Sequence, residues 1–216
     1  MPVDEDDSGY RWRDESPSRL RHTVAEVLGS FPRRSVDPGD DRKPAAVLIA
    51  MADRDGEQGI WLTERSSGLR AHAGQFALPG GRLDPGEDPE TAALRELHEE
   101  LGIALPRSAV LGLLDDYPTR SGYVMTPVVA WVGDAAEPVP NPAEVAAVHW
   151  IPLSDLDVEP RFAPVPGSDR VTIQVPLLGG HLHSPTGAIL YQFREVVLHH
   201  RPTRVDHTDQ PRFAWE

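Results

Sequence analysis

Three glutamates, Glu96, Glu99 and Glu100, are spaced so that a helix would place them at positions i, i+3 and i+4. We expect their carboxylates to share one exposed helix face, where like charges repel by about 0.2–0.5 kcal/mol per pair. A hard divalent cation would offset this repulsion, because Mg²⁺ takes oxygen ligands and bridges carboxylates to substrate phosphates. The spacing therefore predicts a metal site for phosphate chemistry. A solvated acidic helix face is the alternative that the three glutamates alone leave open.

The helix that would carry these glutamates has clear end signals. Asp88 is a good N-cap, Pro89 suits the first helical position, and Gly102 suits the position just past the end, so a helix is predicted from about residue 89 to 101. The apolar positions expected to pack inward are Ala92, Ala93, Leu97 and Leu101. The sequence thus positions the acidic group on one side of an amphipathic helix.

Glycines precede this helix. Gly80, Gly81 and Gly86 predict a loop whose backbone can approach a ligand closely, and a main-chain carbonyl there could complete a metal shell. Arg95 lies one helical turn from Glu99 and can hold a carboxylate in place. We therefore expect the loop and the helix to form one site.

The segment GGRLDPGEDPETAALRELHEELGI, residues 80–103, resembles the Nudix box, which is a glycine, five residues, Glu, seven residues, and then Arg-Glu-aliphatic-any-Glu-Glu-any-Gly-aliphatic. The matching positions are Gly81, Glu87, Arg95, Glu96, Leu97, Glu99, Glu100, Gly102 and Ile103. The resemblance implies an α/β fold, the Nudix-type α/β/α sandwich with a central mixed sheet. It also implies a hydrolase that uses Mg²⁺ or Mn²⁺ to cleave a nucleoside diphosphate linked to another moiety.

The resemblance implies a role for each box residue. The metal ligands would be Glu96, Glu100 and the Gly81 carbonyl, with Glu99 either a further ligand or the base that deprotonates the attacking water. Arg95 would orient Glu96 or Glu99, so that Glu99, Glu96 and Arg95 form the catalytic set. Glu87 would hold the loop or a second ion.

The upstream segment LTERSSGLRAHAGQFALPGG, residues 62–81, is similar to the signature of coenzyme A pyrophosphatases in this superfamily. The matching residues are Leu62, Thr63, Arg65, Ser66, Arg70, Gly74, Gln75, Pro79, Gly80 and Gly81, whereas Leu78 replaces the usual phenylalanine. This similarity extends over roughly residues 44–155 and implies cleavage of coenzyme A, or a derivative, to 3′,5′-ADP and 4′-phosphopantetheine. A Nudix hydrolase for ADP-ribose, NADH or another nucleotide is the alternative, and a non-catalytic nucleotide-binding module is a third.

Substrate recognition would fall to Arg65, Arg70 and Gly80, because a guanidinium pairs bidentately with phosphate. Surface arginines are an equally good explanation, since Lys43 is the sole lysine of this arginine-rich chain. Glu144, which precedes a predicted strand, is a further candidate for a distal metal ligand or base.

The remaining hydrophobic patterns supply the elements that must position the site. They predict an amphipathic helix that ends near Pro32, a strand hairpin, further strands, and a closing helix from Thr186 onward. The strand segments are residues 45–52, 60–65, 109–132 and 146–153. Strands mixed with three helices indicate an α/β sandwich.

Composition and charge bound the remaining possibilities. Residues 1–16 are expected to be a flexible acidic tail, 17–200 a single catalytic domain, and 201–216 a C-terminal tail. The chain has no cysteine and a net charge of −13, which argues against thiol chemistry and against nucleic-acid binding. No stretch reads as a membrane span or an apolar signal region, so we expect a cytoplasmic protein without a membrane partner. Family resemblance predicts a homodimer.

Overall fold

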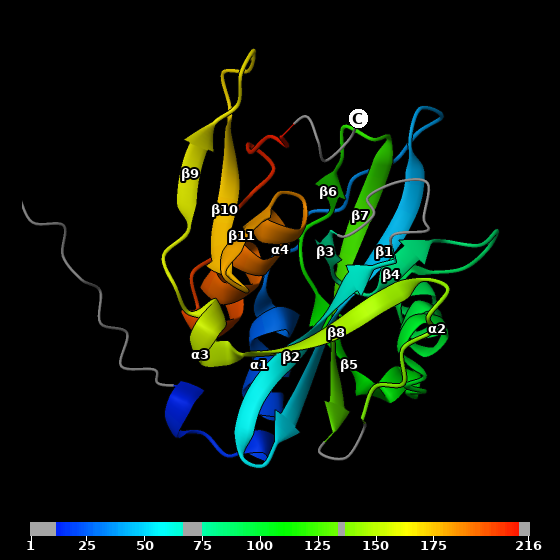
Figure 1. Ribbon diagram of the computed structural model, residues 1–216, viewed down its shortest axis with the longest axis vertical. Coiled ribbons are helices and arrows are strands. Elements are labelled where there is room, and N and C mark those ends of the chain that lie inside the picture. Colours follow the sequence, from blue (N-terminus) through cyan, green and yellow to red (C-terminus); the bar gives the residue numbers. More distant parts are fainter. Residues whose placement is uncertain (1–11, 67–74, 134–136, 212–216) are drawn as a thin grey trace, which may run out of the picture.

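The computed structural model describes residues 12–66, 75–133 and 137–211. These residues form an α/β/α sandwich in which a central sheet lies between helix α2 (Pro89–Leu101) on one face and helices α1 (Pro17–Ser30) and α4 (Thr186–Phe193) on the other (Figure 1). The predicted fold class is therefore confirmed. None of the helices in these ranges is both long and apolar enough to span a bilayer.

The central sheet has eight strands in the described part of the chain, and its main path runs β3-β2-β1-β7-β5. Strands β4, β6 and β8 pair with β1, β7 and β2. The strands are β1 (Lys43–Arg54), β2 (Glu57–Arg65), β3 (Phe76–Ala77), β4 (Gly80–Arg82), β5 (Val110–Leu113), β6 (Tyr117–Pro118), β7 (Tyr123–Gly133) and β8 (Val145–Pro152). Because β1 runs parallel to β7 while its neighbours are antiparallel, the sheet is mixed, as the sequence predicts.

Strands β1 and β2 form the predicted hairpin. Their register pairs Arg54 with Glu57, and Gly56 between them takes a positive φ of 87° that favours glycine. The Gly56 amide also donates a hydrogen bond of 3.0 Å to a carboxylate oxygen of Asp53. Local turn chemistry thus fixes the register of the two strands that lead to the site.

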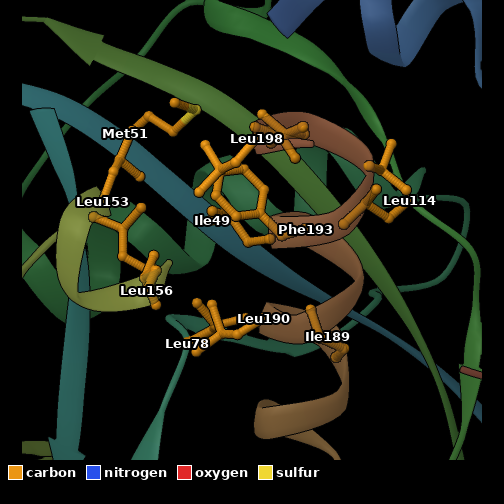
Figure 2. Close-up of a cluster of buried hydrophobic side chains, with 14 of the residues drawn as sticks. Ile49, Met51, Leu78, Leu114, Leu153, Leu156, Ile189, Leu190, Phe193 and Leu198 are labelled. Carbon is orange, nitrogen blue, oxygen red and sulfur yellow. The ribbon is translucent and has the colours of Figure 1, made fainter. Parts of the chain in front are cut away.

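Strand β1 is buried on both faces, and its side chains alternate between two cores. Ile49 and Met51 join the core beneath helices α1 and α4, whereas Leu48 and Ala50 pack beneath helix α2. Figure 2 shows part of the first core, in which Phe193 of helix α4 lies against Ile49. The sheet is therefore fixed from both sides, and α2 is fixed to it.

A second sheet of three antiparallel strands lies beside the sandwich and was not predicted from the sequence. It contains β9 (Arg161–Pro164), β10 (Val171–Leu177) and β11 (Gly180–His183), and it follows the short helix α3 (Leu153–Leu156). Helix α4 packs against this sheet so closely that a β-carbon on Gly187 would lie 2.3 Å from the Leu182 carbonyl. The small sheet therefore extends the core on the α4 side (Figure 1).

Packing extends beyond both limits predicted for the catalytic domain. Trp12 is buried in the short helix η1 (Trp12–Asp14), upstream of the limit at residue 17. Helix α4 continues into a π-helical turn, η3 (Arg194–Leu198), and Val205 and residues 208–210 beyond it are buried. Trp12, Val205 and residues 208–210 thus pack against the core from segments predicted to be tails, whereas Arg13, Arg201 and Asp206 in the same segments are exposed. One further short helix, η2 (Arg107–Ala109), precedes β5.

Candidate active site

Helix α2 begins and ends where the sequence predicts. The Asp88 side chain accepts a hydrogen bond of 2.9 Å from the Thr91 amide, and an ion pair with Arg107 lowers the pKa of this carboxyl to about 2. Gly102 ends the helix in the left-handed conformation, and its amide bonds to the His98 carbonyl. Both ends are therefore fixed, and so is the direction of every side chain between them.

Arg95 is the centre of an ion network on this helix. Its Nη1 donates to Glu96 at 2.9 Å and to Glu99 at 3.0 Å, and its Nε and Nη2 donate to Glu87, both at 3.1 Å. The remaining Nη2 hydrogen bonds the Arg82 carbonyl at 3.0 Å. All five guanidinium N–H donors are used, which fixes the side chain and three carboxylates together.

Glu87 ties the loop before the helix to this network. Its second oxygen accepts a hydrogen bond of 2.9 Å from the Asp84 amide, while Arg95 holds both oxygens. The bond from Arg95 lowers the pKa of Glu87, so the carboxylate remains ionised. Oε2 of Glu87 thus accepts from both the loop and Arg95, and Oε1 accepts from Arg95.

The prediction that the three glutamates share an exposed face is wrong. Glu99 is exposed over 48% of its side chain, whereas Glu96 is exposed over 13% and Glu100 is buried. Helical spacing defines the direction of these side chains, but strand β4 and the segment before β8 cover two of them. Amides of this segment bond to the last carbonyls of the helix, from Val139 to Leu101 at 2.8 Å and from Asn141 to Glu100 at 2.9 Å.

Burial makes the two covered carboxylates hard to ionise. It raises the pKa of Glu96 despite the bond from Arg95, and it raises the pKa of Glu100 to about 8 despite the nearby Arg65 guanidinium. Among the described residues, Oε2 of Glu100 has no hydrogen-bond partner. A buried carboxylate oxygen without a donor costs free energy, and a cation beside it would recover that cost.

Gly80 and Gly81 lie in strand β4 and not in the predicted loop. A β-carbon on Gly81 would lie 2.2 Å from Oε1 of Glu96, and one on Gly80 would lie 2.3 Å from the Ala46 carbonyl. Gly80 also donates a backbone hydrogen bond to Glu100. A side chain at Gly80 would clash with the backbone of β1, and one at Gly81 would displace the Glu96 carboxylate.

The structure brings two more of the predicted residues to this site. Arg65, at the end of β2, is near enough to favour the ionised form of Glu100. The Glu144 carboxylate, in the segment before β8, disfavours ionisation of both Glu96 and Glu100, so it lies near both. Arg70 lies outside the described residues. Sequence spacing could not predict that Glu144 lies near the other glutamates, because its position depends on the pairing of β8 with β2.

These residues fit a divalent cation of the Mg²⁺ type. Their donors are all oxygen: the inward carboxylates of Glu96 and Glu100, the nearby carboxylate of Glu144, and the main chain of Gly81 beside Glu96. In the described ranges, no three His, Cys, Asp or Glu side chains converge as a complete ligand set. Two inward carboxylates are enough for Mg²⁺, which usually takes one or two and fills its shell with water and phosphate.

A cleft of about 380 Å³ borders the site through Arg65 and strand β4, and its described lining includes no glutamate. Its walls include Arg65, Gly80 and Gly81 at one end and Thr119 and Tyr123 at the other. The Arg82 guanidinium lies 5.6 Å from the centre of the Tyr123 ring. Sequence reasoning missed Thr119 and Tyr123, because only the pairing of β7 with β1 brings them to the cleft.

The comparison with protein families matches the NUDIX domain to residues 41–171, more than half of the chain. The chain belongs to the Nudix family. Its matched segment contains the whole arrangement of α2, β4 and the segment before β8. The resemblance found in residues 80–103 is thereby confirmed at the level of the family.

Relatives and solved structures agree with this assignment. The chain is 37% identical over 146 residues to "Nudix hydrolase 3" of Caenorhabditis elegans, covering 66% of this chain and 61% of that protein. It is 41% identical over 147 residues to "Uncharacterized Nudix hydrolase NudL" of Yersinia enterocolitica, covering 65% and 73%. The match spans less than two thirds of the worm protein and of several other NudL proteins.

Two crystal structures have a similar fold. The Nudix hydrolase RenU of M. smegmatis superimposes with a TM-score of 0.50 at 26% identity, covering 72% of this chain and 85% of that one. A MutT/nudix family protein of Enterococcus faecalis gives 0.51 at 16% identity, covering 87% and 78%, and this second likeness concerns the fold alone.

Proposed function

We propose that this Nudix protein is a metal-dependent pyrophosphohydrolase whose substrate is coenzyme A or a close derivative. The hydrolase assignment rests on the environment of Glu100. It is buried, it has an oxygen without a hydrogen-bond partner in the described structure, and its pKa is raised to about 8. A carboxylate in this state beside Glu96 and Gly81 is suited to a cation and not to a solvated helix face.

Glu96, Glu100 and the Gly81 carbonyl would hold Mg²⁺ or Mn²⁺. Glu99 and Glu144 do not converge with them as a complete ligand set, and each is a candidate for a more distal ligand or for the base. When bound, the ion neutralises charge that develops on the diphosphate and polarises its oxygens. With water as the attacking group the reaction needs no covalent nucleophile, so the absence of cysteine is compatible with it. Glu99 is the more exposed carboxylate of the box, which leaves it accessible as a proton acceptor from that water.

Arg95 acts as the positioning residue of this site. It is bonded to Glu87, Glu96 and Glu99 at once, so it sets the direction of the carboxylates before substrate arrives. The same arrangement opposes the mutual repulsion of the glutamates. Its removal should therefore disturb metal affinity and proton transfer together.

The choice of coenzyme A rests on residues 62–81 and on the cleft. Arg65 and Gly80 line the cleft and also lie close to Glu100, so a diphosphate that they bind would lie near the proposed metal ligands. Arg65 carries a buried Nε without a hydrogen-bond partner in the described part, and a phosphate oxygen would supply one. Arg70 belongs to the same proposal through the signature alone. ADP-ribose and NADH are the competing substrates, because the carboxylates specify diphosphate cleavage and not the groups attached to it.

The test is product analysis with purified protein and a panel of coenzyme A, ADP-ribose, NADH and dinucleoside polyphosphates, each with Mg²⁺, Mn²⁺ or EDTA. We expect 3′,5′-ADP and 4′-phosphopantetheine from coenzyme A, at a higher rate than AMP from the others, and no turnover in EDTA. Faster cleavage of another substrate would refute coenzyme A alone. No cleavage with any metal would refute the enzyme and favour a nucleotide-binding module.

Single variants separate the site from the rest of the helix. Glu96→Gln, Glu99→Gln and Glu100→Gln should each lower kcat, whereas Glu90→Gln should not, since Glu90 pairs with Arg107 away from the carboxylate group. Full activity in all three site variants would contradict the assignment.

A small-molecule nucleotide is the partner proposed here. A homodimer in the cytoplasm is likewise a prediction, and light scattering that gives a monomer mass would contradict the dimer.

A further inference from the structure

The cleft that borders strand β4 is positively charged, although the protein as a whole is strongly acidic. The chain has 34 aspartates and glutamates against 21 lysines and arginines, yet the described lining of this cleft has two arginines, Arg65 and Arg82, and no carboxylate. Helix α4 begins at the same cleft, which Pro185 and Thr186 line, and no side chain caps it, so the positive end of its dipole adds to this charge. The cleft is therefore suited to an anion.

The two arginines lie at different ends of the cleft. Arg65 is near Glu100 and the proposed metal ligands, whereas Arg82 lies beside Tyr123 at the other end. Within the described part of the chain, the Arg82 guanidinium forms no ion pair and no hydrogen bond. A substrate with its diphosphate near Arg65 would therefore meet a second cation, with free donors, farther along the cleft.

The surroundings of Arg82 combine positive charge with an aromatic ring. Its guanidinium is 5.6 Å from the centre of the Tyr123 ring, where cation–π attraction helps to hold it. Lys43 pairs with Tyr123 in the register of β1 and β7, and it shares a sheet face with Ala45, which lines the cleft. This combination fits a phosphate attached to a nucleoside, because the phosphate can pair with the cations while the base contacts the ring. The pantetheine half of coenzyme A has no aromatic ring.

The distance between two phosphates on one ribose is compatible with consecutive residues of β4. Gly81 lies beside Glu96, and Arg82 is the next residue, with its Cα about 3.8 Å from that of Gly81. Phosphates on the 5′ and 3′ positions of one ribose are separated by six bonds, which span about 7 Å at most. A diphosphate near Gly81 would therefore bring a 3′-phosphate within reach of the long Arg82 side chain.

We propose that Arg82 binds the 3′-phosphate of the nucleotide half, and so favours coenzyme A over substrates that lack this group. The inference rests on the proposed function and deepens it by naming a residue that determines specificity. A guanidinium with free donors pairs with phosphate oxygens in bidentate geometry, and no carboxylate of the described lining competes for it. ADP-ribose and NADH carry a hydroxyl at this position and would gain no ion pair from Arg82.

The experiment compares coenzyme A with dephospho-coenzyme A, which differs from it only in lacking the 3′-phosphate. Arg82→Gln removes the charge, and Arg82→Lys keeps the charge without the bidentate geometry. Arg21→Gln is the matched control, because Arg21 is exposed on α1 and does not line the cleft. The main-chain carbonyl of residue 82, which accepts a hydrogen bond from Arg95, is retained in every variant. Thermal unfolding establishes that each variant is folded.

The first readout is the steady-state kinetics of both substrates with Mg²⁺. We expect Arg82→Gln to raise the KM for coenzyme A about tenfold or more, because a hydrogen bond between charged groups is worth a factor of this size. The KM for dephospho-coenzyme A should stay within about twofold, Arg82→Lys should be intermediate, and the control should match the wild type. An unchanged KM for coenzyme A would overturn the proposal. An equal rise for both substrates would also overturn it, because Arg82 would then contact the diphosphate.

The second readout is the binding of the nucleotides 3′,5′-ADP and 5′-AMP in Mg²⁺, measured by titration calorimetry, which requires no turnover. The wild type should bind 3′,5′-ADP about tenfold or more tightly than 5′-AMP, and Arg82→Gln should lose most of this preference. A wild type without the preference, or a preference that survives in Arg82→Gln, would contradict the role of Arg82.

Failure of the proposed function is read separately, on the wild-type protein. If wild-type protein cleaves neither coenzyme A nor dephospho-coenzyme A, the proposed function fails, and the binding comparison still decides the role of Arg82. If wild-type protein cleaves both with the same kcat/KM, the pyrophosphohydrolase stands and only the inference about Arg82 fails.

Discussion

Replacing Glu100 by Gln should stabilise the metal-free protein at neutral pH, although it removes a residue of the active site. The folded-state pKa of Glu100 is raised to about 8 from an ordinary value of 4.5, so the folded protein binds this proton more tightly than the unfolded chain. The stability contributed by the group is therefore complete below pH 4.5 and is lost as the pH rises toward 8. Glutamine carries no such titration.

The magnitude follows from the size of the shift. Between pH 4.5 and 8, titration of Glu100 lowers the free energy of unfolding by about 1.4 kcal/mol per pH unit, which amounts to on the order of 3 kcal/mol at pH 7. For a chain of this length, that corresponds to a Tm difference of roughly 6–12 °C. The wild type should lose this stability in EDTA, and the Gln variant should not.

The assay is thermal and urea unfolding of both proteins from pH 5 to 8, in EDTA and in Mg²⁺. Mg²⁺ should stabilise the wild type, because it binds the ionised carboxylate, and should have a much smaller effect on the variant. Glu99→Gln is the control for the pH effect, since that side chain is about half exposed. Parallel pH profiles of the wild type and Glu100→Gln in EDTA would refute the reasoning.

Three further changes test the surroundings of this carboxylate. Gly81→Ala should reduce kcat strongly with a small change in stability, since the new β-carbon would lie 2.2 Å from Oε1 of Glu96 and displace it. Its control is Gly29→Ala in helix α1, where the new β-carbon meets open space. This control should keep its activity, and its free energy of unfolding should rise by about 0.5–1 kcal/mol. Arg95→Lys should lower metal affinity or kcat about 10–100-fold, because lysine cannot bond three carboxylates and a carbonyl at once. The measurement is a titration of the activity with metal. Wild-type kinetics in this variant would contradict the positioning role of Arg95. Gly102→Ala should cost about 1–2 kcal/mol in urea unfolding because φ is 69° there, and an unchanged midpoint would count against the strain.

The local sequence was sufficient to predict those elements whose start and end signals lie within one helical turn or one hairpin. Asp88, Pro89 and Gly102 predict helix α2 over residues 89–101, and the structure confirms both ends, because caps act on the nearest backbone groups. The β1–β2 hairpin is confirmed for the same reason. The spacing of the box residues also predicted that Arg95 would hold a carboxylate, since i and i+4 positions are adjacent on any helix.

Contacts between distant segments decided what local signals could not. The small sheet of residues 161–183 was missed, because its strands are short and gain stability mainly from packing against helix α4. The burial of Trp12 and of residues 208–210 likewise depends on the core and not on their own sequence.

The sequence by itself determined the helix, the order of its carboxylates and membership of the Nudix family. The tertiary structure alone decided that Glu100 is buried, that Gly80 and Gly81 form a strand against it, and that Glu144 lies near it. Helical periodicity fixes the direction in which a side chain leaves the helix, but whether water or protein lies there is set by segments far away in the chain. That difference is what raises the pKa of Glu100 and makes this carboxylate suited to a metal ion.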